Sequence, residues 1–325
     1  MVYKSELINA VKKFKNLNIL VLGDLMVDTY LFGNSTRLSP EAPVPVIDIT
    51  ESTTMLGGAG NVISNLEGLN IKSHICGIVG SDPMGDFIVF KEISGRLAIT
   101  PNRPTTTKTR VVSSGQQLLR FDIENRDNIT EGIENSIIDY IKDELPIMDA
   151  IIISDYGKGV VTQSLLNKLN ALLSNSNKDI IVTIDPKSNQ AIKYREISNY
   201  ISAVTPNHHE AIDMVGEDLG IEKMGNYILK DLNCKYVLIT EGKNGMSLFS
   251  NKEDSIHIDT VAQEVFDVSG AGDTVISVFT LALALGMVAK DAAVLSNIAA
   301  GVVVGEVGTS AINTEKLIKA LEEIK

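Results

Sequence analysis

The chain has 325 residues, of which 44% are hydrophobic and 22% charged, with 25 Gly and 9 Pro. This composition is too apolar for a disordered chain and too poor in Gly and Pro for a fibrous one. The formal net charge of −12 disfavours nucleic acid or an anionic membrane as a partner, because both would repel the molecule at long range.

The first 16 residues predict an amphipathic helix rather than a targeting segment. Leu7, Val11 and Phe14 recur at helical spacing among lysines. The longest uncharged apolar stretch, 274–289, is shorter than the roughly 18 residues that a membrane span requires. The two cysteines show no Cys-x-x-Cys spacing, which indicates free buried thiols and a cytoplasmic protein.

Short β-branched runs alternate with helical stretches along most of the chain. Strands are predicted at 19–22, 75–79, 150–154, 180–184, 204–205 and 237–240, and helices at 133–145, 164–173 and 222–232. Nearly continuous apolar strands are typical of a sheet covered on both faces. The sequence therefore predicts an α/β fold with a doubly wound, mainly parallel sheet flanked by helices. Its final third is predicted to be helical at 271–285, 291–304 and 314–323.

Two segments interrupt this alternation. Residues 28–54 and 105–122 alternate apolar and polar side chains with no helix between them. We interpret them as exposed antiparallel strands of a small β-sheet lid, inserted in one domain that spans residues 1–325. The apolar face of such a lid must be covered. It could be covered by substrate, by closure of the lid, or by a second copy that forms a homodimer through the lid strands.

The strongest local motif is Gly270-Ala271-Gly272-Asp273, directly before the most apolar helix. Glycine lets a ligand approach the backbone closely, and a helix N-terminus offers unpaired N–H groups to an anion. A carboxylate at Asp273 beside that anion is placed to take a proton from an attacking hydroxyl, as phosphoryl transfer requires. The alternative interpretation is an ordinary glycine-rich helix start with an acidic first turn.

Two other nucleotide motifs are excluded. No Gly-x-x-x-x-Gly-Lys-[Ser/Thr] sequence occurs, so the chain has no P-loop. Residues 58–60 and 270–272 both lack the third glycine of the dinucleotide fingerprint, which argues against hydride transfer.

Polar residues follow several predicted strands. Asn207 and Glu210 stand one helical turn apart after the strand at 204–205, an arrangement that suits a largely hydrated Mg²⁺ ion or, alternatively, a helix cap. Thr240, Gly242 and Gly245 end the strand at 237–240, where glycines expose N–H groups to a nucleotide phosphate or simply form a hairpin turn.

Asp24 and Asp28 follow the first predicted strand. Ligands of open α/β sheets bind at the carboxyl ends of the strands, and carboxylates there can accept hydrogen bonds from sugar hydroxyls. Asp24 could equally be a turn residue.

These motifs occur together, and in this order, in the ribokinase-like (phosphofructokinase-B) carbohydrate kinases, which the whole chain resembles. They comprise Gly-Gly-Ala-Gly-Asn at 57–61, Asn207-x-x-Glu210, Thr240-x-Gly242-x-x-Gly245 and the segment 270–273. A narrower set is similar to the D-glycero-β-D-manno-heptose 7-phosphate kinases of that family, either the kinase half of a bifunctional kinase/adenylyltransferase or its stand-alone form. That set comprises 37–46, 106–110, 116–120, 154–159, 185–187 and 300–310.

The resemblance implies ATP-dependent phosphorylation of the anomeric hydroxyl of heptose 7-phosphate, a step toward ADP-heptose. Asp273 is then the catalytic base, and the backbone of Gly270, Ala271 and Gly272 is the anion hole. The implied nucleotide-binding residues are Asn207, Glu210, Thr240, Gly242, Gly245, Asn297 and Lys187, with Mg²⁺ arranged by Asn207 and Glu210 through water. The family often uses a monovalent cation such as K⁺, for which Asp267 and the stretch 305–310 are the implied region.

The resemblance also assigns a sugar side. Asp24, Asp28, Gly57, Gly58 and Asn61 are expected to hold sugar hydroxyls. The phosphate that the sugar already carries needs cations, and the candidates are Lys108, Arg110, Lys158 and Lys187. The resemblance does not show which of these four bind the sugar phosphate and which bind ATP.

Three further expectations accompany the resemblance. No His-x-Gly-His motif occurs, so a separate protein is expected to supply the adenylyltransferase step. The first alternative is a kinase of the same family for another sugar or sugar phosphate. The second is a non-catalytic sugar- or nucleotide-binding module on the same fold.

Overall fold

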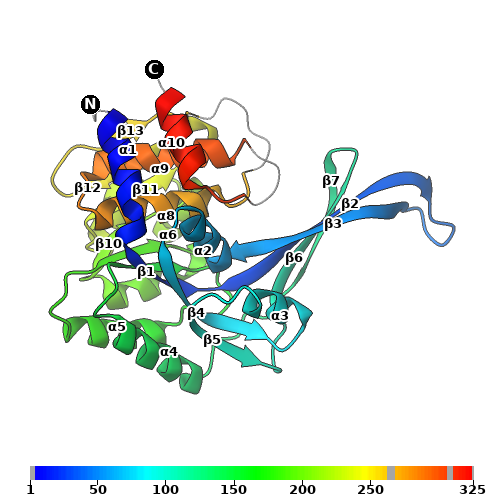
Figure 1. Ribbon diagram of the computed structural model, residues 1–325, viewed down its shortest axis with the longest axis horizontal. Helices are drawn as coiled ribbons and strands as arrows, with labels where there is room; N and C mark the ends of the chain where they lie inside the picture. The colour runs from blue at the N-terminus through cyan, green and yellow to red at the C-terminus, as the bar shows by residue number, and fades with distance from the viewer. Residues whose placement is uncertain (1–3, 262–267, 306–309, 324–325) are drawn as a thin grey trace.

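The computed structural model describes residues 4–261, 268–305 and 310–323. Over these ranges the chain forms a nine-stranded sheet with helices on both faces and a four-stranded sheet that stands out from it as an arm (Figure 1). This is the α/β fold with a small separate sheet that the sequence predicts.

The main sheet has the strand order β13-β12-β11-β10-β9-β8-β1-β4-β5. The strands from β5 to β11 pair in parallel, whereas β12 and β13 add to the edge in antiparallel fashion. Their bounds are β1 Asn18–Gly23, β4 Lys72–Gly80, β5 Gly95–Thr100, β8 Ala150–Ser154, β9 Ile181–Asp185, β10 Ile201–Val204, β11 Tyr236–Thr240, β12 Met246–Ser250 and β13 Ile256–Ile258.

Helices cover both faces of this sheet, which is why its strands are apolar nearly throughout. Successive residues of β1 alternate between two cores: Ile19 and Val21 join one cluster, and Leu20 and Leu22 the other. The first cluster lies under α1 Lys4–Lys13, α2 Ala59–Gly68, α3 Pro83–Val89, α8 Ala271–Ala284, α9 Ala289–Val303 and α10 Thr314–Glu323. The second lies under α4 Glu131–Glu144, α5 Gln163–Ser174, α6 His208–Val215, α7 Ile221–Asp231 and the 3₁₀ segment η2 Ser188–Ile197.

The most deeply buried of these helices is α8, whose residues from Asp273 to Leu283 are all buried. It packs against α2, α9, β8 and β9, so its first turn is held at the carboxyl end of the sheet. Two short 3₁₀ segments, η1 Phe14–Asn16 and η3 Gly242–Asn244, complete the described helical structure. No described helix combines the length and apolarity that a bilayer span needs.

The arm consists of β2 Leu25–Leu38, β3 Pro45–Gly58, β6 Thr106–Ser113 and β7 Gln116–Ile123, in the order β3-β2-β6-β7. The pairs β2–β3 and β6–β7 are antiparallel as predicted, but the central pair β2–β6 is parallel. The expectation of a purely antiparallel sheet is therefore wrong. β2 leaves the main sheet after β1 and β6 leaves it after β5, so both strands run outward from the same body (Figure 1).

Candidate active site

The carboxyl ends of the central strands meet at one edge of the main sheet. The register places Gly23 of β1, Ser154 of β8 and Asp185 of β9 side by side. Asn207 forms an isolated parallel bridge with Thr240, which ends β11. The first turn of α8 closes this edge, so the motifs that the sequence singles out converge here.

Asp273 stands in the first turn of α8. The helix begins after Gly270, whose φ of 82° lies in the left-handed region that glycine adopts without strain. The Asp273 side chain is buried; its carboxylate accepts hydrogen bonds from Asn61 Nδ2 (2.8 Å) and from the Tyr156 hydroxyl (2.9 Å). Burial raises the pKa of Asp273 to about 6, although these two hydrogen bonds act in the opposite direction. Asp273 is thus ionised at neutral pH and close in pKa to an efficient general base.

A cavity of about 510 Å³ opens beside the first turn of α8. It is lined by Asn207, Thr240, Gly242, Lys243, Gly245, Met246, Thr260, Val268, Ala271, Gly272, Val275, Asn297, Ala300, Gly301 and Val304. Two adjoining cavities, of about 470 and 240 Å³, share Asn207 and Thr240 with it. A polar end at the α8 N-terminus and a mostly apolar wall on α9 suit a nucleotide, with its phosphates at the helix and its base against the wall.

The turn between β11 and β12 forms one side of this cavity. Gly242 has a φ of 59° and Gly245 a φ of 91°, and a Cβ on Gly245 would collide with the Ile258 carbonyl oxygen. The turn is the hairpin connection that one interpretation predicts, and it also lines the cavity. The contact of its N–H groups with a nucleotide phosphate stays a prediction. Asn297 of α9 lines the same cavity and donates to the Asp259 carbonyl (2.7 Å).

Asn207 and Glu210 form a helix cap that faces the two smaller cavities. Asn207 Oδ1 accepts from the Glu210 N–H and Glu210 Oε2 accepts from the Asn207 N–H, both at 3.0 Å. Glu210 Oε1 also lies 3.2 Å from Lys187 Nζ. Asp185 faces the 240 Å³ cavity with Glu210, and burial together with the nearby Glu210 and Asp273 carboxylates holds the pKa of Asp185 well above its usual range. This excess of carboxylates fits a divalent cation.

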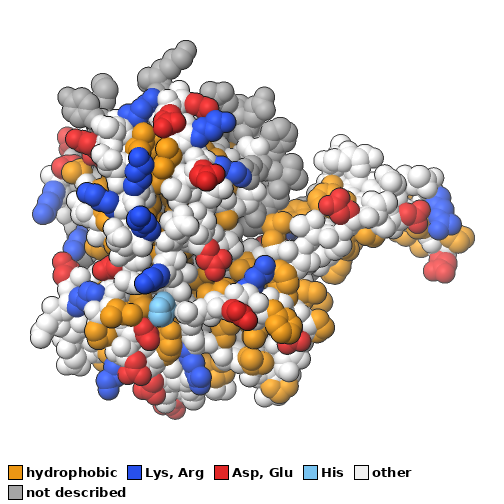
Figure 2. All heavy atoms as spheres, viewed as in Figure 1, with side chains coloured by type: hydrophobic (Ala, Val, Ile, Leu, Met, Phe, Trp, Pro, Cys, Tyr) orange, Lys and Arg blue, Asp and Glu red, His pale blue; other side chains and the backbone are white. Residues whose placement is uncertain are grey.

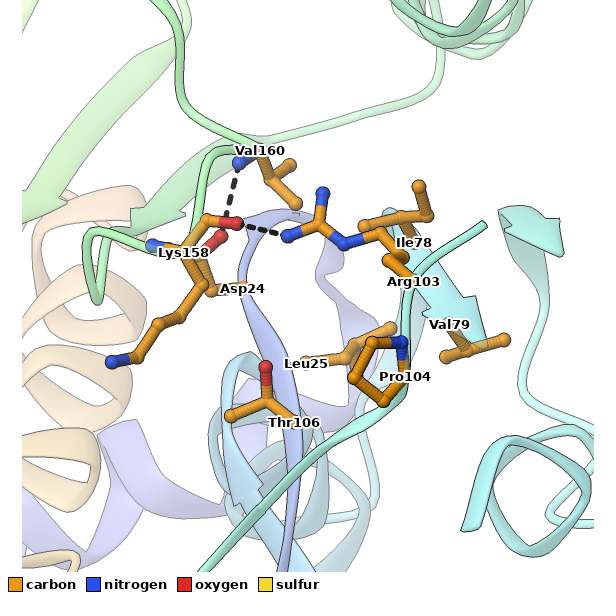
Figure 3. Close-up of a pocket in the computed structure, with 9 residues that line it drawn as sticks. All are labelled: Asp24, Leu25, Ile78, Val79, Arg103, Pro104, Thr106, Lys158 and Val160. Atoms are coloured by element: carbon orange, nitrogen blue, oxygen red, sulfur yellow. Dashed lines mark hydrogen bonds between the residues drawn. The ribbon is translucent and has the colours of Figure 1, made fainter. Parts of the chain in front are cut away.

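Asp24 is already engaged by the backbone. Its carboxylate accepts N–H groups from Tyr156 (2.8 Å), Lys158 (3.0 Å) and Val160 (3.1 Å). Figure 3 shows it in a small pocket beside Arg103, whose guanidinium donates to the Lys158 carbonyl (2.6 Å). Asp24 therefore anchors the loop that follows β8, the structural alternative to the sugar contact expected from the sequence.

Asp28 lies on the arm instead, on the side of Asp273. It is buried, its Oδ1 lies 2.6 Å from Arg110 Nη1, and its charge acts on the Asp273 carboxylate. Gly57 lies on the adjacent strand β3, diagonal to Asp28, and a Cβ there would collide with Asp28 Oδ2. Gly58 has a φ of 56° where α2 begins. The two glycines thus make room for Asp28 and for the α2 start that carries Asn61.

The four predicted cations separate into two groups. Lys187 faces Glu210 beside the nucleotide cavities. The other three lie at the arm: Arg110 pairs with Asp28, Lys158 pairs with Glu124 just after β7, and the Lys108 ammonium lies 5.3 Å from the centre of the Tyr156 ring.

Sequence reasoning missed Tyr156 and Asp185 as site residues. Asp185 is the last residue of β9 and Tyr156 lies two residues after the end of β8, so both stand at the carboxyl edge of the sheet, and this position is the signal that would have found them. Asp267 and most of the 305–310 stretch lie outside the described residues, so the monovalent-cation region stays a prediction.

The profile of the family described as "pfkB family carbohydrate kinase" matches residues 16–316. The chain belongs to this family. It is a carbohydrate kinase. Solved structures with the same fold include ribokinase from Arabidopsis thaliana "complexed with Ribose and ATP" (TM-score 0.71, 18% identity, 95% of this chain and 99% of that one). Phosphofructokinase-2 from Escherichia coli "in complex with substrates and products" is another (TM-score 0.77, 18% identity, 94% and 98%).

Curated relatives share more of the sequence. The "Bifunctional protein HldE" of Desulfatibacillum aliphaticivorans is 40% identical over 322 residues, covering 96% of this chain and 65% of the relative. The protein of the same name from Wolinella succinogenes is 39% identical over 301 residues, covering 90% and 62%. The chain thus spans less than two thirds of the length of these relatives.

Proposed function

We propose that this kinase transfers the γ-phosphoryl group of ATP to the anomeric hydroxyl of D-glycero-β-D-manno-heptose 7-phosphate, giving the 1,7-bisphosphate. The observation that carries the reaction is the position of Asp273. Its carboxylate accepts hydrogen bonds from Asn61 and Tyr156, and the charges of Asp28 and Lys108 on the arm act on it. The neighbouring Gly272 lines the nucleotide cavity. A base between the two substrates is what direct phosphoryl transfer to a sugar hydroxyl requires.

Each part of this arrangement has a task in the proposed reaction. ATP lies in the 510 Å³ cavity with its phosphates toward the backbone N–H groups of Gly270, Ala271 and Gly272, where the α8 dipole stabilises the charge that develops during transfer. The acceptor hydroxyl lies against Asp273. Its oxygen attacks the γ-phosphorus while Asp273 takes its proton, and the bond to the ADP oxygen breaks.

Mg²⁺ fits the carboxylates beside the phosphates. Glu210 and Asp185 would hold it with Asn207, largely through water, and it would neutralise phosphate charge. Lys187 is on the same side and is assigned to ATP. The monovalent cation expected near Asp267 belongs to this proposal as well.

On the sugar side we assign hydroxyl binding to Asp28, Asn61 and the backbone at Gly57 and Gly58. Asp24 is left out because its oxygens already bind the loop backbone. Lys108, Arg110 and Lys158 surround the same space, so the acceptor is a sugar that already carries a phosphate. The similarity to the HldE proteins and the segments shared with heptose 7-phosphate kinases favour the heptose among such sugars.

We also propose that the reaction takes place in the cytoplasm, where ATP is available.

The test of the base is Asp273→Asn. We expect ADP formation that depends on heptose 7-phosphate in the wild type. In the variant we expect turnover lower by about three orders of magnitude or more with unchanged ATP-analogue binding, because the amide cannot take the proton. Asp291→Asn is the matched control, since Asp291 also lies in the first turn of a helix, at the start of α9. Near-normal turnover in Asp273→Asn would contradict the assignment of Asp273 as the base. A wild type that prefers another sugar phosphate would contradict the assignment of heptose 7-phosphate as the substrate.

A further inference from the structure

The cleft-facing side of the arm carries its charges in two neighbouring rows. The register places Asp28, Lys108 and Asp122 in one row across β2, β6 and β7, and Tyr30, Arg110 and Arg120 in the next. Residues two apart on a strand share a face, so both rows lie on the side where Lys108 meets the Tyr156 ring.

The second row places two arginines directly opposite each other. Arg110 and Arg120 are cross-strand partners, and like charges in that position are destabilising. Asp28 lies 2.6 Å from Arg110 Nη1, and Asp122 lies 3.1 Å from Arg120 Nε, so each guanidinium is held in place by a carboxylate. Within these two described rows, three cations stand beside two carboxylates. Burial lowers the pKa of Lys108, and the positive charges of Lys158, Arg110 and Arg120 lower it further. This surplus of cations in a chain of net charge −12 suits an anion.

We propose that Arg120, together with Arg110, binds the phosphate that the sugar substrate already carries and so selects phosphorylated sugars. This inference rests on the proposed function and gives a specificity-determining role to Arg120, which belongs to the segment 116–120 but had no role assigned from the sequence. Arginine suits the task because its planar guanidinium binds phosphate oxygens in pairs.

The spacing of the rows agrees with the shape of such a substrate. The first row, with Asp28 and Lys108, lies close enough to Asp273 for both charges to act on its carboxylate. Two residues along a strand advance by about 7 Å, so the arginine row lies about that much farther from the base. A long sugar with its reacting hydroxyl at Asp273 would place its ring at the first row and a phosphate on its far end at the second.

The experiment compares steady-state kinetics of the wild type, Arg120→Gln, Arg120→Lys and Arg195→Gln, with heptose 7-phosphate and with the unphosphorylated heptose. Arg195 is a matched control on the main body, because it is about as exposed as Arg120 (49% against 50%) and is likewise paired with an aspartate. We expect Arg120→Gln to raise the KM for heptose 7-phosphate by about tenfold with little change in kcat or in the KM for ATP. Arg120→Lys should recover part of that loss, and Arg195→Gln should behave as wild type.

The outcomes separate this inference from the proposed function. A KM for heptose 7-phosphate within about twofold of wild type in Arg120→Gln, or an equal rise for both sugars, overturns the role of Arg120 while the kinase assignment stands. A wild type that turns over both sugars equally well overturns selection by phosphate. A wild type that forms no ADP with any sugar phosphate removes both proposals. Melting temperatures of the variants show whether each of them is folded.

Discussion

Two opposing effects set the basicity of Asp273. Burial disfavours the charged carboxylate and raises its pKa, whereas the hydrogen bonds from Asn61 and Tyr156 favour the charged form and lower it. The charged groups that face it come from several elements: Asp28 on β2 raises the pKa, Lys108 on β6 lowers it, and Asp185 at the end of β9 adds a further carboxylate nearby. The resulting pKa of about 6 leaves Asp273 ionised at neutral pH and still basic enough to accept a proton in the proposed reaction.

Removing the Tyr156 hydroxyl should therefore move the pH dependence of the reaction. The base works only when deprotonated, so kcat/KM falls as the pH drops through the pKa of Asp273. Tyr156→Phe deletes a hydrogen-bond donor to the carboxylate and so raises the pKa of Asp273. A hydrogen bond to a charged group contributes about 1.5 kcal/mol, so the acid limb of the kcat/KM profile should shift upward by about one pH unit. The loss of activity should be larger at pH 6 than at pH 8.5.

The control for this variant is Tyr140→Phe, which removes a hydroxyl that lies 2.6 Å from His74 Nδ1. Its pH profile should match the wild type. An equal loss of activity at all pH values in Tyr156→Phe would show that the hydroxyl orients the site without tuning the base.

The sequence identifies Asp273 but not its partner Tyr156, for a physical reason. Asp273 belongs to a contiguous motif in which the glycines and the helix start are local features. Tyr156 is 117 positions away and reaches the carboxylate only because β8 ends beside α8 in the folded sheet. Asp24 illustrates the reverse case: its position after β1 suggests a ligand, but the N–H groups that occupy it come from a distant loop.

At the scale of elements, the loop at 155–160 connects the parts of the site. Its Tyr156 hydroxyl donates to Asp273, and its Lys158 pairs with Glu124 just after β7. The Asp24 carboxylate accepts a hydrogen bond from the loop backbone at Val160. Gly159 permits this path: its φ is 88°, and a Cβ there would collide with the Asp127 carbonyl oxygen. Gly159 is thus required for two reasons, its backbone conformation and the lack of space for a side chain.

Replacing Gly159 and a second glycine with alanine should separate the cost of backbone strain from the cost of the steric collision. Gly115, in the β6–β7 turn, also has a positive φ (76°), but a Cβ there would meet open space. We expect Gly115→Ala to lower the free energy of unfolding by about 1–2 kcal/mol from backbone strain alone. Gly159→Ala should lower it by about 2–5 kcal/mol, because the collision adds to the strain. Urea denaturation measures both, and equal losses would contradict the predicted collision.

The element scale also shows what periodicity can and cannot predict. Alternating side chains placed the arm strands, and β-branched runs placed β1, β4, β8, β9 and β11 of the main sheet. The strand predicted at 204–205 shares only Val204 with β10, which spans Ile201–Val204. The parallel β2–β6 pair was not predictable in this way, because alternation reports which face a side chain takes and carries no information on which strands become neighbours.

At the scale of the whole molecule, the arm stands clear of the main body and bears hydrophobic side chains (Figure 2). Its face opposite to the charged rows carries Leu119, Phe121 and Ile123 on β7, each between 45% and 57% exposed. These residues alternate with Arg120 and Asp122 along the strand, so the arm has one charged face toward the cleft and one apolar face away from it. An exposed apolar sheet face of this kind is typical of an interaction surface.

We therefore expect the kinase to be a homodimer in which the arms of two copies cover each other's apolar faces. Light scattering across micromolar concentrations should give twice the mass of the chain for the wild type and the monomer mass for Phe121→Asp, because a buried, unpaired carboxylate at the interface is unfavourable. Phe90→Asp is the matched control, since Phe90 is 81% exposed at the end of α3 on the main body and should leave the dimer intact. A wild type that stays monomeric at all concentrations, or a Phe121→Asp variant that still dimerises, would show that the apolar faces of the arms do not form the interface.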